Sequence, residues 1–392
     1  MAQLINLKTF KEFLNSSTGG GIILFSCLLI SLIIANTPLA VPFNNLLETV
    51  VGFENESIHL KYSVALWVND GLMAIFFLLV GLEIKRELVE GELSSPRQAA
   101  LPILAAVGGA VVPAIIYVGF NFGLETQHGW GIPMATDIAF ALAVISMLGN
   151  RVPTSLKIFL AALAIVDDLL AILVIAFFYS TDLHTTYLLY AGAIFALLLL
   201  FNRFGVKSLW MYLLPGLFIW YFIHHSGIHA TIAGVLVAMT LPTTPDATES
   251  PLEKLEHLLA RPVNFIIVPI FALVNTNITF QSEMIGGLTS NMGLGIIVGL
   301  VVGKTLGILA TCYICVKSGL AKLPELANWN HIIGVGMLGG IGFTMSIFVS
   351  LLSFSDALHI EEAKLAILVG SLIAGVSGYL FLNALHTKRA KN

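Results

Sequence analysis

The chain has 392 residues, of which 57% are hydrophobic and 11% charged, and its formal net charge is −4. Soluble globular domains carry about a quarter charged residues. The composition therefore excludes a soluble protein of this size and indicates an integral membrane protein.

The first apolar run is GGGIILFSCLLISLIIAN, residues 19–36, and it follows Lys8 and Lys11. No small-residue cleavage site of a signal peptide comes after it. The run is also long enough to cross a bilayer, which takes about twenty residues. We therefore expect the first transmembrane helix here.

Apolar runs of this kind recur along the whole chain and predict an all-α polytopic membrane protein that forms a single domain over residues 1–392. The predicted spans are twelve: 14–36, 64–84, 98–122, 130–149, 157–179, 185–202, 207–224, 227–242, 255–276, 293–316, 329–353 and 363–386.

The distribution of lysine and arginine supports this count. With the N-terminus in the cytoplasm, sixteen of the 19 basic residues fall in cytoplasmic segments, and only Lys61 and Lys364 fall on the other side. Cytoplasmic loops carry such an excess in membrane proteins. The pattern predicts that both termini are cytoplasmic.

Three further segments have simple interpretations. The external connection 37–63 contains Pro38, Pro42 and Gly52 and predicts a short hairpin or an interfacial helix. The linker LPTTPDATESPLEK, residues 241–254, predicts a solvated connection. The cysteines of CYIC, 312–315, lie one helical turn apart in an apolar run, and without a second ligand pair they predict no metal or redox site.

Four ionisable residues lie near the middle of predicted spans: Asp137, Asp167, Asp168 and Lys304. A charge at the bilayer centre costs roughly 2.5–3.5 kcal/mol. A structural ion pair could account for Lys304 and one aspartate, but it would leave the other carboxylates without compensation. These residues therefore indicate function. Neighbouring helical residues point about 100° apart, so Asp167 and Asp168 have different roles, and either could be the partner of Lys304.

The segment around Asp137 is GWGIPMATDIAFAL, residues 129–142, in which Gly129, Gly131 and Pro133 disfavour a helix. It predicts an unwound break, and such a break is tolerated in a membrane where it lines a cavity. Free carbonyls and the Thr136 hydroxyl then provide neutral oxygens beside a carboxylate. Small hard cations prefer such oxygen ligands.

A second glycine-rich segment is GVGMLGGIGFTMSIF, residues 334–348, with five glycines in nine residues. Close helix packing explains it equally well by itself. The two segments, however, lie in spans four and eleven, the middle members of the triples 3–5 and 10–12. These triples have opposite orientations in the membrane. Paired interruptions in inverted repeats are typical of the substrate site of a secondary transporter.

Six segments resemble those of NhaA-type sodium/proton antiporters, and the resemblance extends from about residue 10 to 386. They are GLEIKRELVEGEL, GIPMATDIAFAL, LKIFLAALAIVDDLLAI, SGIHATIAGV, GKTLGI and GGIGFTMSIF. The resemblance implies twelve helices, with spans four and eleven unwound and crossing near the midplane. It also implies a homodimer formed through the hairpin after span one, in the inner membrane of a bacterium.

The implied activity is export of sodium or lithium in exchange for protons by alternating access, with electrogenic and pH-regulated transport. Protons and cations compete for the same carboxylates, and the activity serves pH and sodium homeostasis. Besides these ions and the lipid bilayer, no cofactor, no nucleic acid and no enzymatic activity are expected.

The resemblance also implies roles for single residues. Asp168 is the main carrier of cation and proton, Asp167 is linked to Lys304, and Asp137 and Thr136 occupy the unwound position. A cytoplasmic cluster associated with pH control comprises Glu83, Arg86, Glu87 and Glu256. His229 matches a histidine that is also linked to the pH response.

These regulatory positions have plainer interpretations, since charges at helix ends are commonly interfacial anchors and a histidine can simply pack. Two positions depart from the pattern: Thr305 stands where proline is expected, and Ala260 where a second histidine is expected. Neither position is a carboxylate, and the second concerns only pH sensing.

Other functions are also compatible with buried aspartates. An intramembrane aspartyl protease needs two carboxylates on separate helices, but its YD and GxGD motifs are absent around Asp137 and Asp168. The HExxH motif of a zinc protease is absent as well. A symporter or a channel is a closer alternative, and a sodium flux without proton coupling would indicate one of them.

Overall fold

The structure is a computed structural model that describes residues 17–55, 59–180, 183–243, 250–280 and 282–389. Within these residues the elements are helices, apart from one two-stranded antiparallel sheet. The predicted all-α class therefore needs one addition, a small β-hairpin. The start of the first predicted span, with Lys8 and Lys11, lies outside the described residues.

The chain divides into two compact units, and the division falls within two helices, α2 and α8. The first unit comprises residues 1–26, 92–171 and 281–392. Its elements are part of α2 (Ser17–Ala35), α6 (Pro96–Asn121), η2 (Glu125–Met134), α7 (Ile138–Met147), η3 (Gly149–Arg151), most of α8 (Thr154–Phe178), α14 (Ser282–Gly287), α15 (Asn291–Val298), η5 (Gly299–Gly303), α16 (Lys304–Lys317), α17 (Trp329–Gly339), α18 (Phe343–Ser353) and α19 (Ala357–Arg389).

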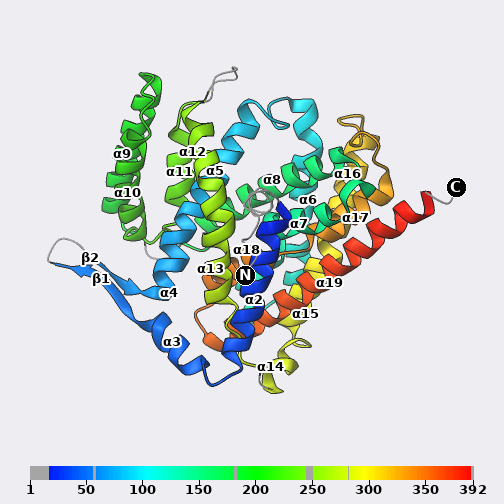
Figure 1. Cartoon of the computed structure of the whole chain (residues 1–392), viewed down its shortest axis with the longest axis horizontal. Coiled ribbons are helices and arrows are strands. Elements are labelled where there is room, and N and C mark those ends of the chain that lie inside the picture. The colour runs from blue at the N-terminus through cyan, green and yellow to red at the C-terminus, as the bar shows by residue number, and fades with distance from the viewer. Residues whose placement is uncertain (1–16, 56–58, 181–182, 244–249, 281, 390–392) are drawn as a thin grey trace, which may run out of the picture. The chain divides into compact units, whose positions relative to one another are not determined.

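The second unit comprises residues 27–91 and 172–280. Beside the remaining parts of α2 and α8 it contains α3 (Ala40–Glu48), β1 (Val50–Glu54), β2 (His59–Ser63), α4 (Val64–Leu66), η1 (Trp67–Leu72), α5 (Met73–Val89), α9 (Thr185–Arg203), α10 (Trp210–His224), α11 (Ile232–Thr240), α12 (Pro251–Pro262), η4 (Val263–Ile267) and α13 (Val268–Asn275). In this unit α5 packs against α11 and α12, and α10 packs against α9 (Figure 1).

The described residues contain 7 helices long and apolar enough to cross a membrane, and up to 10 spans if each bent helix pair is one span. The chain is thus a multi-pass membrane protein. Helix α10, with 15 residues, and α11, with 9, are shorter than the roughly twenty residues that a crossing needs. The twelve predicted spans therefore stay a prediction.

The connection between the first two apolar helices contains both of the elements predicted as alternatives. Helix α3 comes first, and then β1 pairs antiparallel with β2, with Val50 opposite Ser63 and Glu54 opposite His59. Every residue of β1 is exposed.

The linker 241–254 is described only at its ends. Its last residues form a capping box: the Glu253 N–H donates to Ser250 Oγ at 3.3 Å, and the Ser250 N–H donates to the Glu253 carboxylate at 2.8 Å. This arrangement satisfies two backbone donors at the start of α12.

Two apolar segments are broken where the glycines and Pro133 predict it. Elements η2 and α7 meet at an angle of 43°, and α17 and α18 at 47°. Pro133 lacks a backbone N–H, and Ala135 and Asp137 adopt extended conformations between the two helical pieces. At the second break, Gly340–Gly342 separate α17 from α18.

Close packing of α6 on α16 brings Lys304, in the second triple, next to the first triple. A Cβ atom on Gly307 would lie 2.1 Å from the Gly108 carbonyl oxygen, so the two backbones touch where these glycines face each other. Small residues permit this approach between membrane helices. Lys304 lies one turn before Gly307 on the same helix and is fully buried.

Candidate ion site

The first unit brings together five of the residues predicted for transport. Thr136 and Asp137 lie at the break between η2 and α7, Asp167 and Asp168 in the middle of α8, and Lys304 at the start of α16. None of the five is more than 2% exposed. Charged groups are almost never buried to this degree unless they are paired or functional.

Lys304 forms an ion pair with Asp167, the choice that the residues alone left open. Its ammonium group donates to Asp167 Oδ2 and to the carbonyl oxygen of Met134, and both charged side chains are 0% exposed. Met134 is the last residue of η2, whose final carbonyls lack partners within the helix. The lysine charge therefore compensates both a carboxylate and the negative end of a broken helix.

The backbone before Lys304 has an irregular turn. Residues 299–303 form the π-helical segment η5, and Lys304 is the first residue of the α-helix that follows. Such π-turns inside α-helices frequently occur at functional sites. Two glycines face the lysine stem: a Cβ on Gly109 would lie 3.6 Å from Lys304 Cδ, and one on Gly339 would lie 3.9 Å from Lys304 Cγ, both ordinary contact distances.

The Thr136 hydroxyl lies between two acceptors. Its oxygen is 2.6 Å from Asp167 Oδ2 and 2.7 Å from the carbonyl oxygen of Gly339, the last residue of α17. A hydroxyl has one proton, so it donates to only one of them at a time. Asp167 Oδ1 is buried and accepts no hydrogen bond from the residues that the structure describes. The group offers carboxylate, hydroxyl and carbonyl oxygens, the ligands of a small hard cation.

Asp168 follows Asp167 on α8 and is 1% exposed. Its carboxylate interacts electrostatically with Lys304. The site thus holds two adjacent buried carboxylates, and Asp167 makes a direct ion pair with the lysine. A single lysine cannot neutralise both when both are ionised.

Asp137 binds the N-termini of two half-helices. Its Oδ1 accepts from the Phe140 N–H of α7 at 2.9 Å, and its Oδ2 accepts from the N–H and the hydroxyl of Thr344 in α18, at 3.1 and 2.5 Å. A carboxylate is favourable at the positive end of a helix, and here two such ends share one.

The carboxylate beside the Thr136 hydroxyl is that of Asp167, on α8, and not that of its sequence neighbour Asp137. The segment between the half-helices is extended, and successive side chains of an extended backbone point to opposite sides. Thr136 and Asp137 are neighbours in sequence, but Thr136 contacts Asp167 whereas Asp137 binds the two half-helices α7 and α18.

The predicted pH cluster lies in the second unit and joins α5 to α12. Arg86 donates to Glu256 Oε1 at 2.5 Å and to Glu87 Oε1 at 3.1 Å, and the Glu256 side chain is 7% exposed. Glu83 interacts electrostatically with the carboxylates of Glu256 and Glu87 and with Arg86. These side chains bind one another across two helices, which simple interfacial anchors do not need to do.

Other predicted positions have local partners. His229 lies in the second unit, where its Nε2 donates to the Tyr179 carbonyl oxygen at 3.0 Å. Thr305, at the position where proline was expected, donates its hydroxyl to the Val301 carbonyl one turn earlier, at 2.9 Å. Cys312 and Cys315 are buried and have free thiols.

Several groups at the site escape prediction from the sequence. Lys304 and Thr136 use the carbonyl oxygens of Met134 and Gly339, and any residue type can provide these. The Thr344 hydroxyl, in the second interrupted span, donates to Asp137 in the first. The Ser371 hydroxyl oxygen accepts from backbone N–H groups at the break of the second span. The only signal for Thr344 is its position just after the glycines of GGIGFTMSIF, and Ser371 has none.

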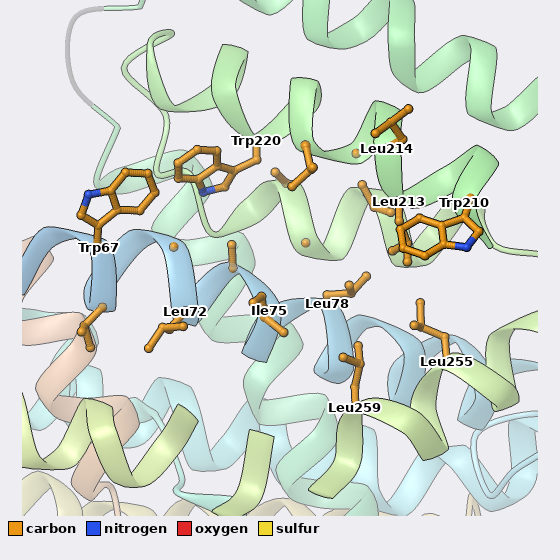
Figure 2. Close-up of a pocket in the computed structure, with 18 of the residues that line it drawn as sticks. Trp67, Leu72, Ile75, Leu78, Trp210, Leu213, Leu214, Trp220, Leu255 and Leu259 are labelled. Carbon is orange, nitrogen blue, oxygen red and sulfur yellow. The ribbon is translucent and has the colours of Figure 1, made fainter. Parts of the chain in front are cut away.

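A large cavity of the second unit lies elsewhere and has a different character. It has a volume of about 760 Å³ and no charged side chain among its lining residues. Figure 2 shows Trp67 and Trp220 at one end and Trp210 at the other, with leucines between them. This cavity offers a cation no anionic ligand, and its apolar walls suit hydrocarbon. The buried carboxylates of the first unit, and not this cavity, therefore provide the ligands for a cation.

Comparison with known proteins agrees with the six segments noted above. Residues 11–382 match the family model described as Na+/H+ antiporter 1. An antiporter of Flavobacterium johnsoniae, Na(+)/H(+) antiporter NhaA 2, is 63% identical over 385 residues, which are 98% of this chain and 94% of that protein.

Two further relatives are named Na(+)/H(+) antiporter NhaA. That of Flavobacterium psychrophilum is 50% identical over 95% of each chain, and that of Bordetella parapertussis is 47% identical over 96% of each chain. All three are named as antiporters, which are transporters rather than enzymes. With its paired breaks, its buried aspartates and this similarity along nearly its whole length, the chain belongs to the NhaA family of Na+/H+ antiporters.

Proposed function

We propose that the protein exports Na+, and also Li+, in exchange for H+ across the cytoplasmic membrane of a bacterium by alternating access. The observation that carries this proposal is the buried group of Asp167, Asp168 and Lys304, in which Asp167 pairs with the ammonium group and the adjacent Asp168 interacts with it electrostatically. The names of the relatives support the choice of Na+ and H+. A role in pH and sodium homeostasis follows from the exchange itself.

In the proposed cycle, Asp167 and Asp168 bind either protons or a cation. When the site faces the cytoplasm and loses its protons, Na+ takes the carboxylate oxygens together with the Thr136 hydroxyl. The site then opens to the other side, the cation leaves and protons return. Lys304 compensates one carboxylate throughout or exchanges a proton itself, and Asp137 holds the half-helices in place beside the site.

The proposed exchange is electrogenic, because the protonatable groups outnumber the single charge of the cation. Moving one charge through 100 mV corresponds to about 2.3 kcal/mol, so the membrane potential can drive export. A symporter or a channel with the same buried acids would not link the sodium flux to opposite proton movement.

We further propose twelve spans within one transporter domain over residues 1–392, with both termini cytoplasmic. Helices α10 and α11 provide the seventh and eighth spans. The triples α6 to α8 and α15 to α19 are the inverted repeats, and the breaks in their middle spans support this pairing. The exposed edge of β1 supports a homodimer formed through the hairpin, since an unpaired strand edge can pair with another chain.

The first test measures exchange in everted membrane vesicles with an acid interior and a pH-reporting dye. We expect Na+ and Li+, but not K+, to collapse the gradient in the wild type, and Asp168→Asn to abolish the response. The matched control is Asp356→Asn, because the Asp356 side chain is 58% exposed. Normal exchange by Asp168→Asn would refute the role of Asp168. A wild type that conducts Na+ without moving protons would refute antiport.

Regulation by pH is a second part of the proposal, and the contacts of Arg86 with Glu256 and Glu87 support it. Arg86→Gln removes the charge that favours ionised Glu256, so we expect the pH–activity profile to move to higher pH by about one unit. The change is measured as the midpoint of the profile in the same vesicles. Arg203→Gln, at an exposed site on α9, should leave the midpoint in place. Equal midpoints in the wild type, Arg86→Gln and Arg203→Gln would show that Arg86 has no role in pH control. His229 belongs to this proposed regulatory set.

A further inference from the structure

Ser371 holds the break between α17 and α18 from a third helix, α19. Its hydroxyl oxygen accepts hydrogen bonds from the backbone N–H groups of Gly342, at 3.2 Å, and Phe343, at 3.1 Å. The Ser371 side chain is part of the buried core, with 7% of the residue exposed. Because α18 begins at Phe343, no carbonyl of α18 can accept from these two N–H groups.

Two side chains of different chemistry thus accept hydrogen bonds from the backbone N–H groups at the N-terminus of α18. The Asp137 carboxylate takes the N–H of Thr344, and the neutral Ser371 hydroxyl takes the two N–H groups before it. A hydroxyl oxygen has two lone pairs, and Ser371 uses both here. The carboxylate therefore remains available to bind α7 as well.

The same short segment carries a carbonyl of the ion site. Residues 339–342 begin with Gly339, whose carbonyl oxygen lies 2.7 Å from the Thr136 hydroxyl. The Ile341 carbonyl accepts from the Asp137 N–H at 2.7 Å. The bonds of Ser371 fix the other end of this segment, at Gly342 and Phe343. A shift at that end changes the position of the Gly339 carbonyl relative to Thr136.

We propose that Ser371 is a positioning residue of the cation site: its hydroxyl fixes the 339–342 segment and so sets where the Gly339 carbonyl and the Thr136 hydroxyl meet Asp167. Ser371 touches neither the cation nor the carboxylates that carry it, so it acts through backbone position. This inference rests on the proposed function, because its effect is seen in sodium affinity.

Ser371→Ala leaves two buried N–H groups without their acceptor, and the segment moves to satisfy them. The carboxylates and Lys304 remain unchanged, so the steps after cation binding are preserved. We expect the KM for Na+ to rise about three- to tenfold, while the maximal rate changes less than about twofold. Ser371→Thr retains the hydroxyl and should restore the wild-type KM.

The experiment measures KM and maximal rate for Na+ in vesicles that carry wild type, Ser371→Ala, Ser371→Thr or Ser377→Ala. The last variant is the matched control: Ser377 lies on the same helix, but its hydroxyl donates within that helix, to the Ala374 carbonyl at 3.1 Å. A wild type without Na+-dependent exchange would contradict the proposed function. If the wild type exchanges normally, a Ser371→Ala KM equal to that of Ser377→Ala overturns the present inference alone.

Two further outcomes distinguish a positioning role of Ser371 from a general role in supporting the fold. If Ser371→Ala lowers the maximal rate and leaves KM unchanged, the serine supports the fold and the inference is wrong. If Ser371→Ala does not reach the membrane, Ser371→Cys decides the matter, because a thiol is a weaker acceptor of similar size. In Ser371→Cys, a KM for Na+ that is above the wild-type value by less than tenfold supports the positioning role. A KM equal to that of the wild type overturns it.

Discussion

Lys304→Met is expected to lower the free energy of unfolding by about 3–5 kcal/mol, because it leaves the Asp167 carboxylate buried and without its cation. Both side chains of the pair are 0% exposed, so water cannot replace the ammonium group. The methionine has a similar length and adds no charge. The Met134 carbonyl also loses its donor. Thermal unfolding of the purified protein in detergent measures this loss.

A double-mutant cycle separates the ion pair from the packing of the lysine stem. Asp167→Asn combined with Lys304→Met removes both charges, and we expect this protein to be more stable than Lys304→Met alone. Lys317→Met is the control, since Lys317 ends α16 outside the buried site and its ammonium group lies over the Tyr313 ring. If Lys304→Met melts at the wild-type temperature, the pair does not stabilise the protein as its burial indicates.

Gly307→Ala is expected to separate α6 from α16 and to lower the free energy of unfolding by about 1–3 kcal/mol. The added methyl group would lie 2.1 Å from the Gly108 carbonyl oxygen and 2.6 Å from its carbon, and backbone atoms cannot turn aside as a flexible side chain can. Because Lys304 lies one turn away, exchange activity should fall as well. Unfolding temperature and vesicle exchange are measured together.

Gly119→Ala provides the matched control for this change. Gly119 also lies on α6, but a methyl group added there would meet no atom of a neighbouring element within 4 Å. We expect this variant to keep its activity and its stability, or to gain up to about 1 kcal/mol, since alanine favours a helix over glycine. Equal losses in both variants would show that glycine flexibility, rather than helix contact, explains Gly307.

Much of the fold is predictable because membrane physics acts on long stretches of sequence. Apolar runs mark the helices, and Pro133 and the glycines around residue 340 mark the breaks, because both effects depend on residue type. Length limits this reasoning at the predicted spans 207–224 and 227–242, where α10 and α11 are shorter than the roughly twenty residues that a crossing needs. The β-hairpin was one of two alternatives, since turn residues in 37–63 do not distinguish a hairpin from a helix beside it.

The candidate site is predictable in its members but not in its contacts. Charged residues at the middle of apolar runs identify Asp137, Asp167, Asp168 and Lys304, because each is costly there. Which aspartate faces Lys304 depends on helix rotation, and a sequence does not contain that angle. The carbonyl groups of Met134 and Gly339 depend on backbone position alone. Ser371 lies on another helix altogether, and a serine in a membrane helix is common.

Because Asp137 is bonded to α7 and α18 at once, neither half-helix can turn away alone without losing the acceptor of one N–H group in its first turn, that of Phe140 or of Thr344. In hydrocarbon each unsatisfied backbone group costs several kcal/mol. Rotation of both half-helices together with Asp137 retains these bonds. We therefore expect the two broken spans to change orientation in one concerted step, so that a state with only one of them rearranged is too rare to be populated.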